Sequence, residues 1–519
     1  MKKKYTMDKT KNTMFRNYNH LGFNNPYYFE NNGKFEIQKN FPRIIEKFND
    51  ERKIDSVAVV ELLNKNYILA DRTLFQGIHK TPWLAKPNVQ LNKWEYDKAQ
   101  KHDLLDIKEE EIAKTLFKKI CSEIEFYIGN KKKVGVLLSG GMDSRMVAGA
   151  LDYLIKTYKL EGLDVTGLTW GNEGSRDVVY AKEITKRLNW KWKHYTVTAK
   201  NLLDNITETA IHGCEYSPIH LHAIPQIRDD NQDLEVILAG SYGDSVGRGE
   251  YSGIKVRFIK PIFQNISNVC GIINQSIFNN SLKNIENDIK SYHEQFPEKE
   301  SYMQNELDYQ IHYMRRQLNS CMGLLSGKME FHQIFTQPYV YGYMWSINPE
   351  KRNDLIYKYM FQEFKTKLND IPWARTGIPY YNKKGKPDPF QKKHHSYVNL
   401  IHKVIFKEIK ELILSEEINK LGVFNQTNLK FLLKLIKYIP SNNLFYLEKI
   451  IWIASIAKMV KIYNIQIIKF EISNPYKTNI NWISVLIEYT LRIIRIKISF
   501  IKKIKINKLP RSRADEISK

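Results

Sequence analysis

The feature that most constrains this chain is a short apolar run that leads directly into a glycine turn, Val134–Ser144 (VGVLLSGGMDS). Its β-branched and aliphatic residues are typical of a strand that a parallel sheet buries on both faces. The two glycines allow a tight turn that brings backbone N–H groups close to a ligand, and Arg145–Leu154 then has the pattern of a helix. We therefore expect a phosphate-binding loop at a helix N-terminus, where Mg²⁺ bridging Asp143 to the phosphates explains the acidic residue.

A simpler interpretation of this stretch is an ordinary strand–turn–helix junction with a capping aspartate. The full string S-G-G-x-D-S after a buried strand is more specific than a Gly-Gly pair. It lacks the Gly-Lys-Ser/Thr that closes a P-loop, and it does not have the G-x-G-x-x-G spacing of a dinucleotide-binding turn. The string instead resembles the pyrophosphate loop of enzymes that split ATP between the α and β phosphates, such as asparagine synthetases, NAD and GMP synthetases and tRNA-thiolating enzymes.

The sequence after this loop alternates between strand and helix patterns. Strands are predicted at Val165–Trp170, Trp192–Thr198 and Glu235–Ala239, and helices at Arg176–Leu188 and Asn201–His212. Such alternation predicts an α/β fold with a doubly wound parallel sheet, in which ligands lie at the carboxyl ends of the strands. Gly240–Glu250 (GSYGDSVGRGE) follows the last of these strands, and its four glycines and aspartate predict a second loop close to the same ligand.

The regions on either side of this central part differ from it in composition and in predicted secondary structure. Residues 1–110 are predicted as a small β-rich unit with Ser56–Leu63 (SVAVVELL) as its clearest strand, and Lys108–Tyr127 as an amphipathic helix. Residues 111–400 are predicted as the nucleotide-binding domain, which turns helical from about residue 257. Residues 401–519 are predicted as a basic, Ile- and Lys-rich, mostly helical extension.

Within this extension, Ile483–Ile506 is both apolar and basic. A membrane-surface helix is one interpretation. A core-packing segment with snorkelling lysines is favoured, because Arg492–Lys505 alternates almost like a strand.

Composition narrows the classes of protein. The four cysteines are scattered without a C-x-x-C pair, which argues against a structural zinc site or a redox dithiol and fits a reducing compartment. The N-terminus has no apolar core after its lysines and no run of 18 apolar residues occurs, so we expect a cytoplasmic protein without a signal peptide or transmembrane segment. The net charge of +24 permits acidic partners, but much of it is Lys set among Ile and Asn, as in a compositional bias.

Three stretches together resemble the asparagine synthetase family, which includes β-lactam synthetases and the ring-closing enzymes of lasso-peptide pathways. They are Arg72–Ile78 (RTLFQGI), the loop Ser139–Ser144, and Gly240–Gly249 with Asp244 at its centre. The resemblance is good over about residues 65–260 and diffuse to about 380. It implies a sheet of the adenine-nucleotide α-hydrolase type and separates this chain from NAD, GMP and thiolation enzymes.

The resemblance also implies cofactors and site residues. ATP and Mg²⁺ are expected, with Asp143 and Asp244 as metal ligands. The implied nucleotide-binding residues are Leu137, Ser139, Gly140, Gly141, Asp143, Ser144, Leu168, Trp170 and Gly240. In this chemistry a carboxylate attacks the α-phosphorus of ATP, pyrophosphate departs, and an amine attacks the acyl-adenylate. The predicted function is an AMP-forming, amide-forming ligase.

The chain departs from the family pattern at several positions. Glutamine-hydrolysing members carry a cysteine after the initiator methionine, whereas Lys2 stands here, and we expect no glutamine hydrolysis. Ser241 and Ser245 replace two glutamates of the second loop, of which the first handles the proton of the attacking amine. Serine alone is a poor base. Nearby polar candidates for this task are Glu215, His220 and His222.

The substrate-binding part departs as well. The family's E-x-R-x-P-F-L-D segment falls at Ile334–Tyr341 (IFTQPYVY), which keeps Pro338 and an aromatic residue, so a substrate other than aspartate is expected. The family uses a cation from a late loop to stabilise the adenylate, and the candidates here are Arg375, Lys383, Lys384 and Lys386. Asp244, Arg375 and Lys383 are the predicted catalytic residues.

Two other function classes stay open at this point. Ser241 in place of glutamate favours a nucleotide-binding partner or regulator that has lost turnover. The charge of +24 favours RNA modification, which the absence of a C-x-x-C pattern and the R-T-L-F stretch disfavour. The expected partners are small-molecule or peptide carboxylates and amines, and no nucleic acid is expected. Contact of the basic C-terminal tail with a membrane surface is an open alternative.

Overall fold

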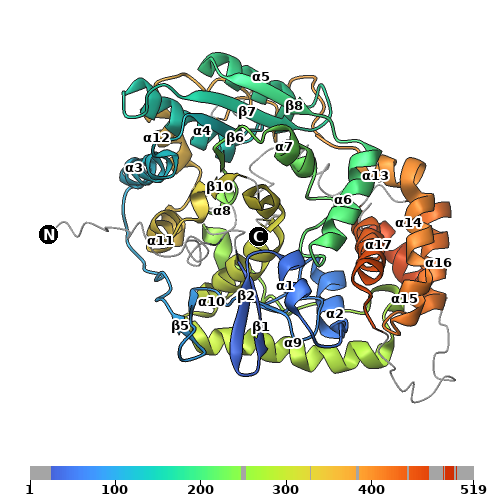
Figure 1. Cartoon of the computed structure of the whole chain (residues 1–519). Helices are drawn as coiled ribbons and strands as arrows, with labels where there is room; N and C mark the ends of the chain where they lie inside the picture. Colours follow the sequence, from blue (N-terminus) through green and yellow to red (C-terminus); the bar gives the residue numbers. More distant parts are fainter. Residues whose placement is uncertain are drawn as a thin grey trace.

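A five-stranded parallel sheet carries the predicted phosphate loop (Figure 1). The computed structural model describes Leu21 and residues 25–246, 253–318, 320–327, 329–380, 385–440, 444–466, 483, 485–495 and 498. The strands are β6 (Lys133–Leu137), β7 (Asp164–Trp170), β8 (Lys191–Tyr195), β9 (Val236–Ala239) and β10 (Glu330–Gln333). Their order is β10-β9-β6-β7-β8, and each neighbouring pair is parallel. The predicted α/β class with a parallel sheet is confirmed.

Helices cover both faces of this sheet, because side chains that alternate along its strands are buried on both sides. Val134 and Val136 of β6 belong to one hydrophobic cluster, with residues of α3 (Glu109–Ile128), α4 (Met142–Lys156) and α5 (Arg176–Leu188). Leu137 belongs to the other cluster, with residues of α6 (Ala199–Ile211) and α7 (Ile224–Asp230). Because successive side chains of a strand point to opposite faces, the two clusters lie on the two sides of the sheet. The sheet is therefore doubly wound.

The chain reverses its direction across the sheet between β6 and β9. It runs outward from β6 through β7 to β8, and then returns to place β9 and β10 on the other side of β6. Loops that leave the carboxyl ends of the two strands at such a switch point diverge and leave a crevice for a ligand. The strand β10 was not predicted, because its sequence EFHQ is short and lacks the alternation of a strand.

The strand predicted at Ser56–Leu63 is wrong, because these residues form the helix α2 (Ser56–Lys65). The Asp55 carboxylate caps its N-terminus by accepting hydrogen bonds from the amides of Val57 and Ala58. Asn66 ends it in the left-handed conformation. A short apolar run fits a buried helix as well as a buried strand, and the cap signals decide between them.

The remaining N-terminal strands are short and antiparallel. β1 (Tyr27–Asn31) pairs with β2 (Lys34–Gln38) and β3 (His79–Lys80), and β4 (Ala85–Asn88) pairs with β5 (Lys93–Tyr96). The helix α1 (Phe41–Lys47) lies between β2 and α2 in the chain. The N-terminal region thus combines two small sheets with two helices.

Helices make up most of the chain after β9. The longer ones are α9 (Gln275–Gln295), α10 (Ser301–Asp308), α11 (Pro338–Trp345), α12 (Leu355–Glu363), α14 (Phe406–Ile413), α16 (Gln426–Tyr438) and α17 (Phe445–Tyr463). Residues 485–495 are also helical, so the strand-like alternation predicted from Arg492 onward is wrong over Arg492–Arg495. Most of Ile496–Lys505 lies outside the described residues. Among the helices that the structure describes, none is both long and apolar enough to cross a membrane.

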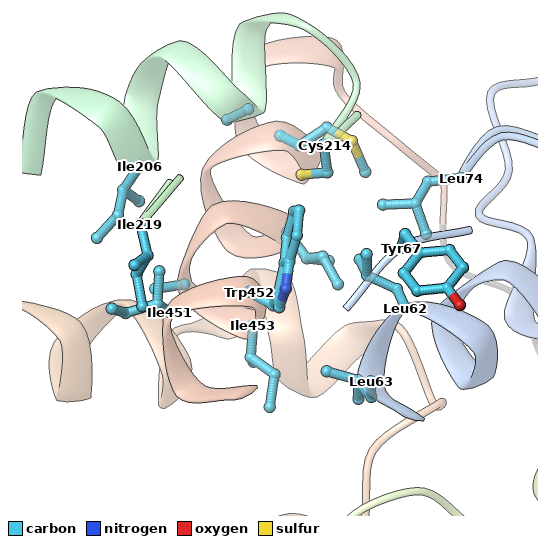
Figure 2. Packing of buried hydrophobic residues seen from close by; sticks show 14 of the residues in the cluster. Leu62, Leu63, Tyr67, Leu74, Ile206, Cys214, Ile219, Ile451, Trp452 and Ile453 are labelled. Atoms are coloured by element: carbon cyan, nitrogen blue, oxygen red, sulfur yellow. The ribbon is translucent and has the colours of Figure 1, made fainter. Parts of the chain in front are cut away.

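The helix α17 packs with the N-terminal region in one core (Figure 2). Figure 2 shows Trp452 of α17 with Leu62 and Leu74 of the N-terminal region on one side, and Ile206 and Ile219 on the other. Trp452 is 2% exposed. The tail is therefore packed into the body of the protein, and the boundaries at residues 110 and 400 stay a prediction.

A buried ionic network around Glu306 also connects segments that are far apart in the sequence. Its carboxylate accepts a hydrogen bond from Arg352 at 2.8 Å and lies 3.2 Å from Nε2 of His102, whose Nδ1 is 2.6 Å from Glu298. Burial alone would lower the pKa of His102, but the hydrogen bonds to Glu298 and Glu306 outweigh it and raise that pKa to about 9. Burial would raise the pKa of Glu306, but Arg352 and His102 outweigh it and lower that pKa.

We expect His102→Gln to destabilise the protein by about 3 kcal/mol at pH 6, because it removes one partner from a buried charged network. The folded pKa of His102 is raised from 6.5 to about 9, so its contribution is complete below pH 6.5 and disappears as the pH rises through about 9. Urea unfolding of wild type and variant at pH 6 and pH 9.5 measures this.

The control is Lys114→Gln, which removes an exposed charge that pairs with Glu110 and should leave the free energy of unfolding nearly unchanged at both pH values. An equal loss for His102→Gln at both pH values would contradict the assigned charge state.

Candidate functional site

The loop after β6 is folded onto itself by its two serines. The Ser144 hydroxyl accepts a hydrogen bond from the Ser139 amide at 3.2 Å, and the two hydroxyl oxygens lie 3.3 Å apart. The Gly141 amide donates to the Ser139 hydroxyl at 3.1 Å. Gly141 is also the N-cap of α4, without a side-chain cap. The predicted phosphate-binding residues therefore stand together at the N-terminus of a 15-residue helix, where the dipole favours an anion.

The loop after β9 packs directly against the first loop. A Cβ atom added at Gly240 would lie 2.6 Å from the carbonyl carbon and oxygen of Asp143, and one at Gly243 would lie 2.6 Å from the Asp143 Cβ. Neither approach leaves room for a side chain. The Asp244 carboxylate accepts a hydrogen bond from the Ser245 amide at 2.9 Å. The described part of the predicted second loop thus meets the first at the residue that was expected to hold Mg²⁺, while residues 247–250 lie outside the described residues.

Tyr357 of α12 connects these two loops, and sequence reasoning missed it. Its hydroxyl lies 3.1 Å from Oδ1 of Asp143 and 3.0 Å from the carbonyl oxygen of Gly243. With one proton, the hydroxyl donates to one of these oxygens at a time. Tyr357 is fully buried, so it restrains the position of the Asp143 carboxylate from a distance of 214 residues in sequence.

Arg145 restrains the first loop through hydrogen bonds, and sequence reasoning did not identify it either. Its guanidinium is fully buried and donates to four backbone carbonyls, those of Gly140, Leu368, Ile371 and Pro372, at 2.8 to 3.2 Å. A buried charge is tolerated when it is hydrogen-bonded in this way. Arg145 therefore holds the segment that precedes the predicted late loop against the phosphate loop.

The late loop begins at this contact. The Ala374 amide donates to the Gly140 carbonyl at 3.1 Å, and Arg375 follows immediately. The Arg375 guanidinium lies 5.0 Å above the Trp373 ring. Lys386 is exposed, and the candidates Lys383 and Lys384 lie outside the described residues. Of the described candidates, Arg375 is the one next to a residue that contacts the phosphate loop.

Aromatic rings surround the carboxyl end of β7, where the adenine pocket was predicted. Leu137 is 5% exposed and Leu168 is fully buried. Trp170 stacks on His222 at 5.6 Å between ring centroids, and His394 lies 5.6 Å from His222. The segment around His394 is tied to the end of β7, because its carbonyl accepts a hydrogen bond from the Asn172 amide at 2.7 Å.

Three histidines near Trp170, namely His220, His222 and His395, have lowered pKa values and are uncharged near neutral pH. Burial lowers the pKa of His220 to about 4. Burial and the neighbouring histidines lower the pKa of His395 to about 4 and that of His222 well below its usual value. A base with so low a pKa accepts a proton poorly at pH 7. These rings suit contact with a flat neutral group better than proton transfer.

The third candidate base, Glu215, serves another part of the molecule. Its carboxylate accepts a hydrogen bond from Arg316 at 2.9 Å and lies 3.9 Å from the ammonium nitrogen of Lys80. Both its partners and Glu215 itself are buried. This ion pair joins the N-terminal sheet to the helical part of the chain, as a structural contact.

Two loop carboxylates, on Asp143 and Asp244, suit a magnesium ion that shares its ligands with phosphates. Mg²⁺ in nucleotide sites commonly takes one or two carboxylates, and substrate phosphates and water complete its coordination. Among the described residues, no group of three or more His, Cys, Asp or Glu side chains is arranged to hold a metal by itself. The pair therefore fits a metal that arrives with a nucleotide.

Comparison with protein-family models matches residues 130–314 to asparagine synthase. Residues 130–314 form a synthetase domain of the asparagine synthetase family. The match begins just before β6 and includes both loops at the switch point, whereas Tyr357 and Ala374 lie beyond it. An asparagine synthase domain implies an ATP-dependent ligase that forms carbon–nitrogen bonds. The residue roles at its site, including the metal ligands, stay predictions.

We expect Tyr357→Phe to weaken binding of MgATP about tenfold, since it removes a hydrogen bond to a charged group. Titration of the protein with a fluorescent ATP analogue, with and without Mg²⁺, measures this. The loss should appear with Mg²⁺ and largely vanish in EDTA, because the hydroxyl acts through Asp143.

Tyr359→Phe, on the same helix and partly buried, is the matched control and should bind MgATP like wild type. An unchanged affinity in Tyr357→Phe would show that Asp143 needs no such restraint.

Proposed function

We propose that this protein is an AMP-forming ligase that adenylates a carboxylate and then joins it to an amine, without hydrolysing glutamine itself. The observation that supports it most is the meeting of three segments at one point. The loops after β6 and β9 are in contact at Asp143, and the Arg145 guanidinium holds the segment before Arg375 against Gly140. These are the parts that adenylation needs: a phosphate cradle, two carboxylates and a nearby cation.

In the first half-reaction the protein mainly orients the nucleotide and stabilises charge. The amides at the start of α4 and the hydroxyls of Ser139 and Ser144 would bind the β- and γ-phosphates, which lowers the barrier to departure of pyrophosphate. Mg²⁺ held by Asp143 and Asp244 would neutralise phosphate charge as the α-phosphorus is attacked. Arg375 would balance the negative charge on the adenylate.

The neutral aromatic group around Trp170 would hold the adenine. It lies beside β7, on the opposite side of β6 from the β9 loop. A flat uncharged base can stack between such rings and accept hydrogen bonds from them. His220 and His222 therefore belong to nucleotide binding in this proposal, and the proton of the amine goes to a different acceptor.

A second candidate function is a nucleotide-binding partner that no longer turns over. Ser241 and Ser245 favour it, because both replace glutamates of the second loop. Such a protein would bind MgATP through the same residues and release no pyrophosphate.

ATP–pyrophosphate exchange with Mg²⁺ separates the two functions. We expect exchange with one pool among sugar acids, peptides with free carboxylates and small metabolite acids. Asp143→Ala and Asp244→Ala should each reduce the exchange rate at least 100-fold, because each removes a proposed ligand of the Mg²⁺ that neutralises the charge on the leaving pyrophosphate. Asp204→Ala removes an exposed carboxylate of α6 that pairs with Lys200 and should leave exchange unchanged.

Exchange that survives both site variants would contradict the assigned metal ligands. Mg²⁺-dependent ATP binding without exchange in any pool would favour the binding partner. With an active acid in hand, ammonia or an amine should support product formation, and glutamine alone should not.

A further inference from the structure

The C-terminal helix exposes an apolar stripe that the described part of the chain leaves uncovered. The stripe consists of Ile483, Ile487, Leu491, Ile494 and Ile498, which follow one another at intervals of three or four residues. Such intervals place side chains on one face of a helix. Each of the five is between 44% and 51% exposed. A surface helix of a globular protein normally directs this kind of face toward the core.

The opposite face of the helix anchors it to the body of the protein. Val485 and Tyr489 are each 1% exposed, and the Tyr489 hydroxyl donates to the Ile439 carbonyl at 2.8 Å. The Glu488 carboxylate accepts a hydrogen bond from the Cys270 amide at 2.7 Å. The helix is thus held with its buried face inward, and the stripe points away from the core.

The end of α16 adjoins the C-terminal helix at Tyr489, whose hydroxyl donates to the Ile439 carbonyl. Tyr438 is 73% exposed and Ile439 is 45% exposed. The exposed lysines of α16 are Lys430, Lys434 and Lys437, and its sequence QTNLKFLLKLIKY contains no acidic residue. We call the stripe, Tyr438, Ile439 and these lysines the tail patch.

The charge of the tail patch is strongly positive. Arg495 is exposed at the end of the described helix, and the guanidinium of Arg492 lies over the Phe445 ring at 3.7 Å. Glu488 is the one acidic residue among residues 485–495, and it is engaged by the Cys270 amide. The sequence from 496 to 514 adds seven lysines and arginines and no acidic residue.

We propose that the tail patch docks the protein on an anionic lipid bilayer. Exposed Ile and Leu side chains would enter the boundary between headgroups and acyl chains, while lysines and arginines would lie at the level of the acidic headgroups. Tyr438 has the amphipathic ring that favours this depth. Contact of this kind needs no spanning helix.

Charge complementarity selects this occupant over two others. A second copy of the chain would bring an equally basic patch against this one, and like charges across an interface oppose association. A nucleic acid would match the charge but would leave the five aliphatic side chains without an apolar partner.

Flotation of the full-length protein with lipid vesicles tests the proposal. We expect binding to vesicles of 70% phosphatidylcholine and 30% phosphatidylglycerol at 150 mM NaCl, and at least tenfold weaker binding to phosphatidylcholine alone. The triple variant Ile487→Ser, Leu491→Ser and Ile494→Ser should bind the anionic vesicles at least tenfold more weakly. Lys434→Glu with Lys437→Glu should also weaken binding, and high salt should mimic that variant.

The control variant is Val89→Ser with Leu91→Ser, which removes two aliphatic side chains between β4 and β5. They are 64% and 66% exposed. It should bind vesicles like wild type. Unchanged MgATP affinity in every variant would show that the fold is intact, so that loss of vesicle binding and loss of the proposed ligase activity can be told apart.

Three outcomes would overturn the proposal. The first is wild type that does not bind anionic vesicles, and the second is a triple variant that binds them as well as wild type. The third is a different occupant, seen as a dimer that the triple variant converts to monomer, or as RNA binding that the same variant abolishes.

Discussion

The contact between Gly240, Gly243 and Asp143 is the constraint on which the site depends. Two strands that lie side by side at the switch point send their loops in different directions, and a crevice results. Here two glycines allow the second loop to come back against the first, at distances that no Cβ atom tolerates. Tyr357 closes the arrangement with its hydroxyl near both loops. The two predicted metal ligands are therefore brought to one place by backbone contact.

The sequence was most informative where local pattern and ligand chemistry coincide. The glycine loop and the helix Arg176–Leu188 could be predicted because strand, turn and helix signals follow one another without ambiguity. The helix at Ser56–Lys65 could not, because a run of six buried residues hides its period. The strand β10 is four residues long and is specified by its pairing with β9.

The missed site residues share a different cause. Tyr357 has ordinary neighbours in sequence and Arg145 directly follows the phosphate-loop motif, but the importance of both arises from contacts more than 200 residues away. A motif describes what lies next to a ligand, while these residues hold the motif in position. Of the late-segment cations that the structure describes, Arg375 and Lys386, Arg375 is the one next to a residue that contacts Gly140, and Arg145 holds this part of the segment there through tertiary contacts.

The core around Trp452 also governs when the protein can finish folding. The Lys449 ammonium donates to the Leu63 carbonyl across 386 residues of chain, and Arg52 donates to the Tyr463 carbonyl across 411. At ribosomal rates of 5 to 20 residues per second, the N-terminal helices wait roughly 20 to 80 s for α17. During this interval Leu62, Leu63 and Leu74 lack one wall of their core. Nascent chains thus carry an exposed apolar surface until α17 has been synthesised, and we expect chaperones to bind them during this interval.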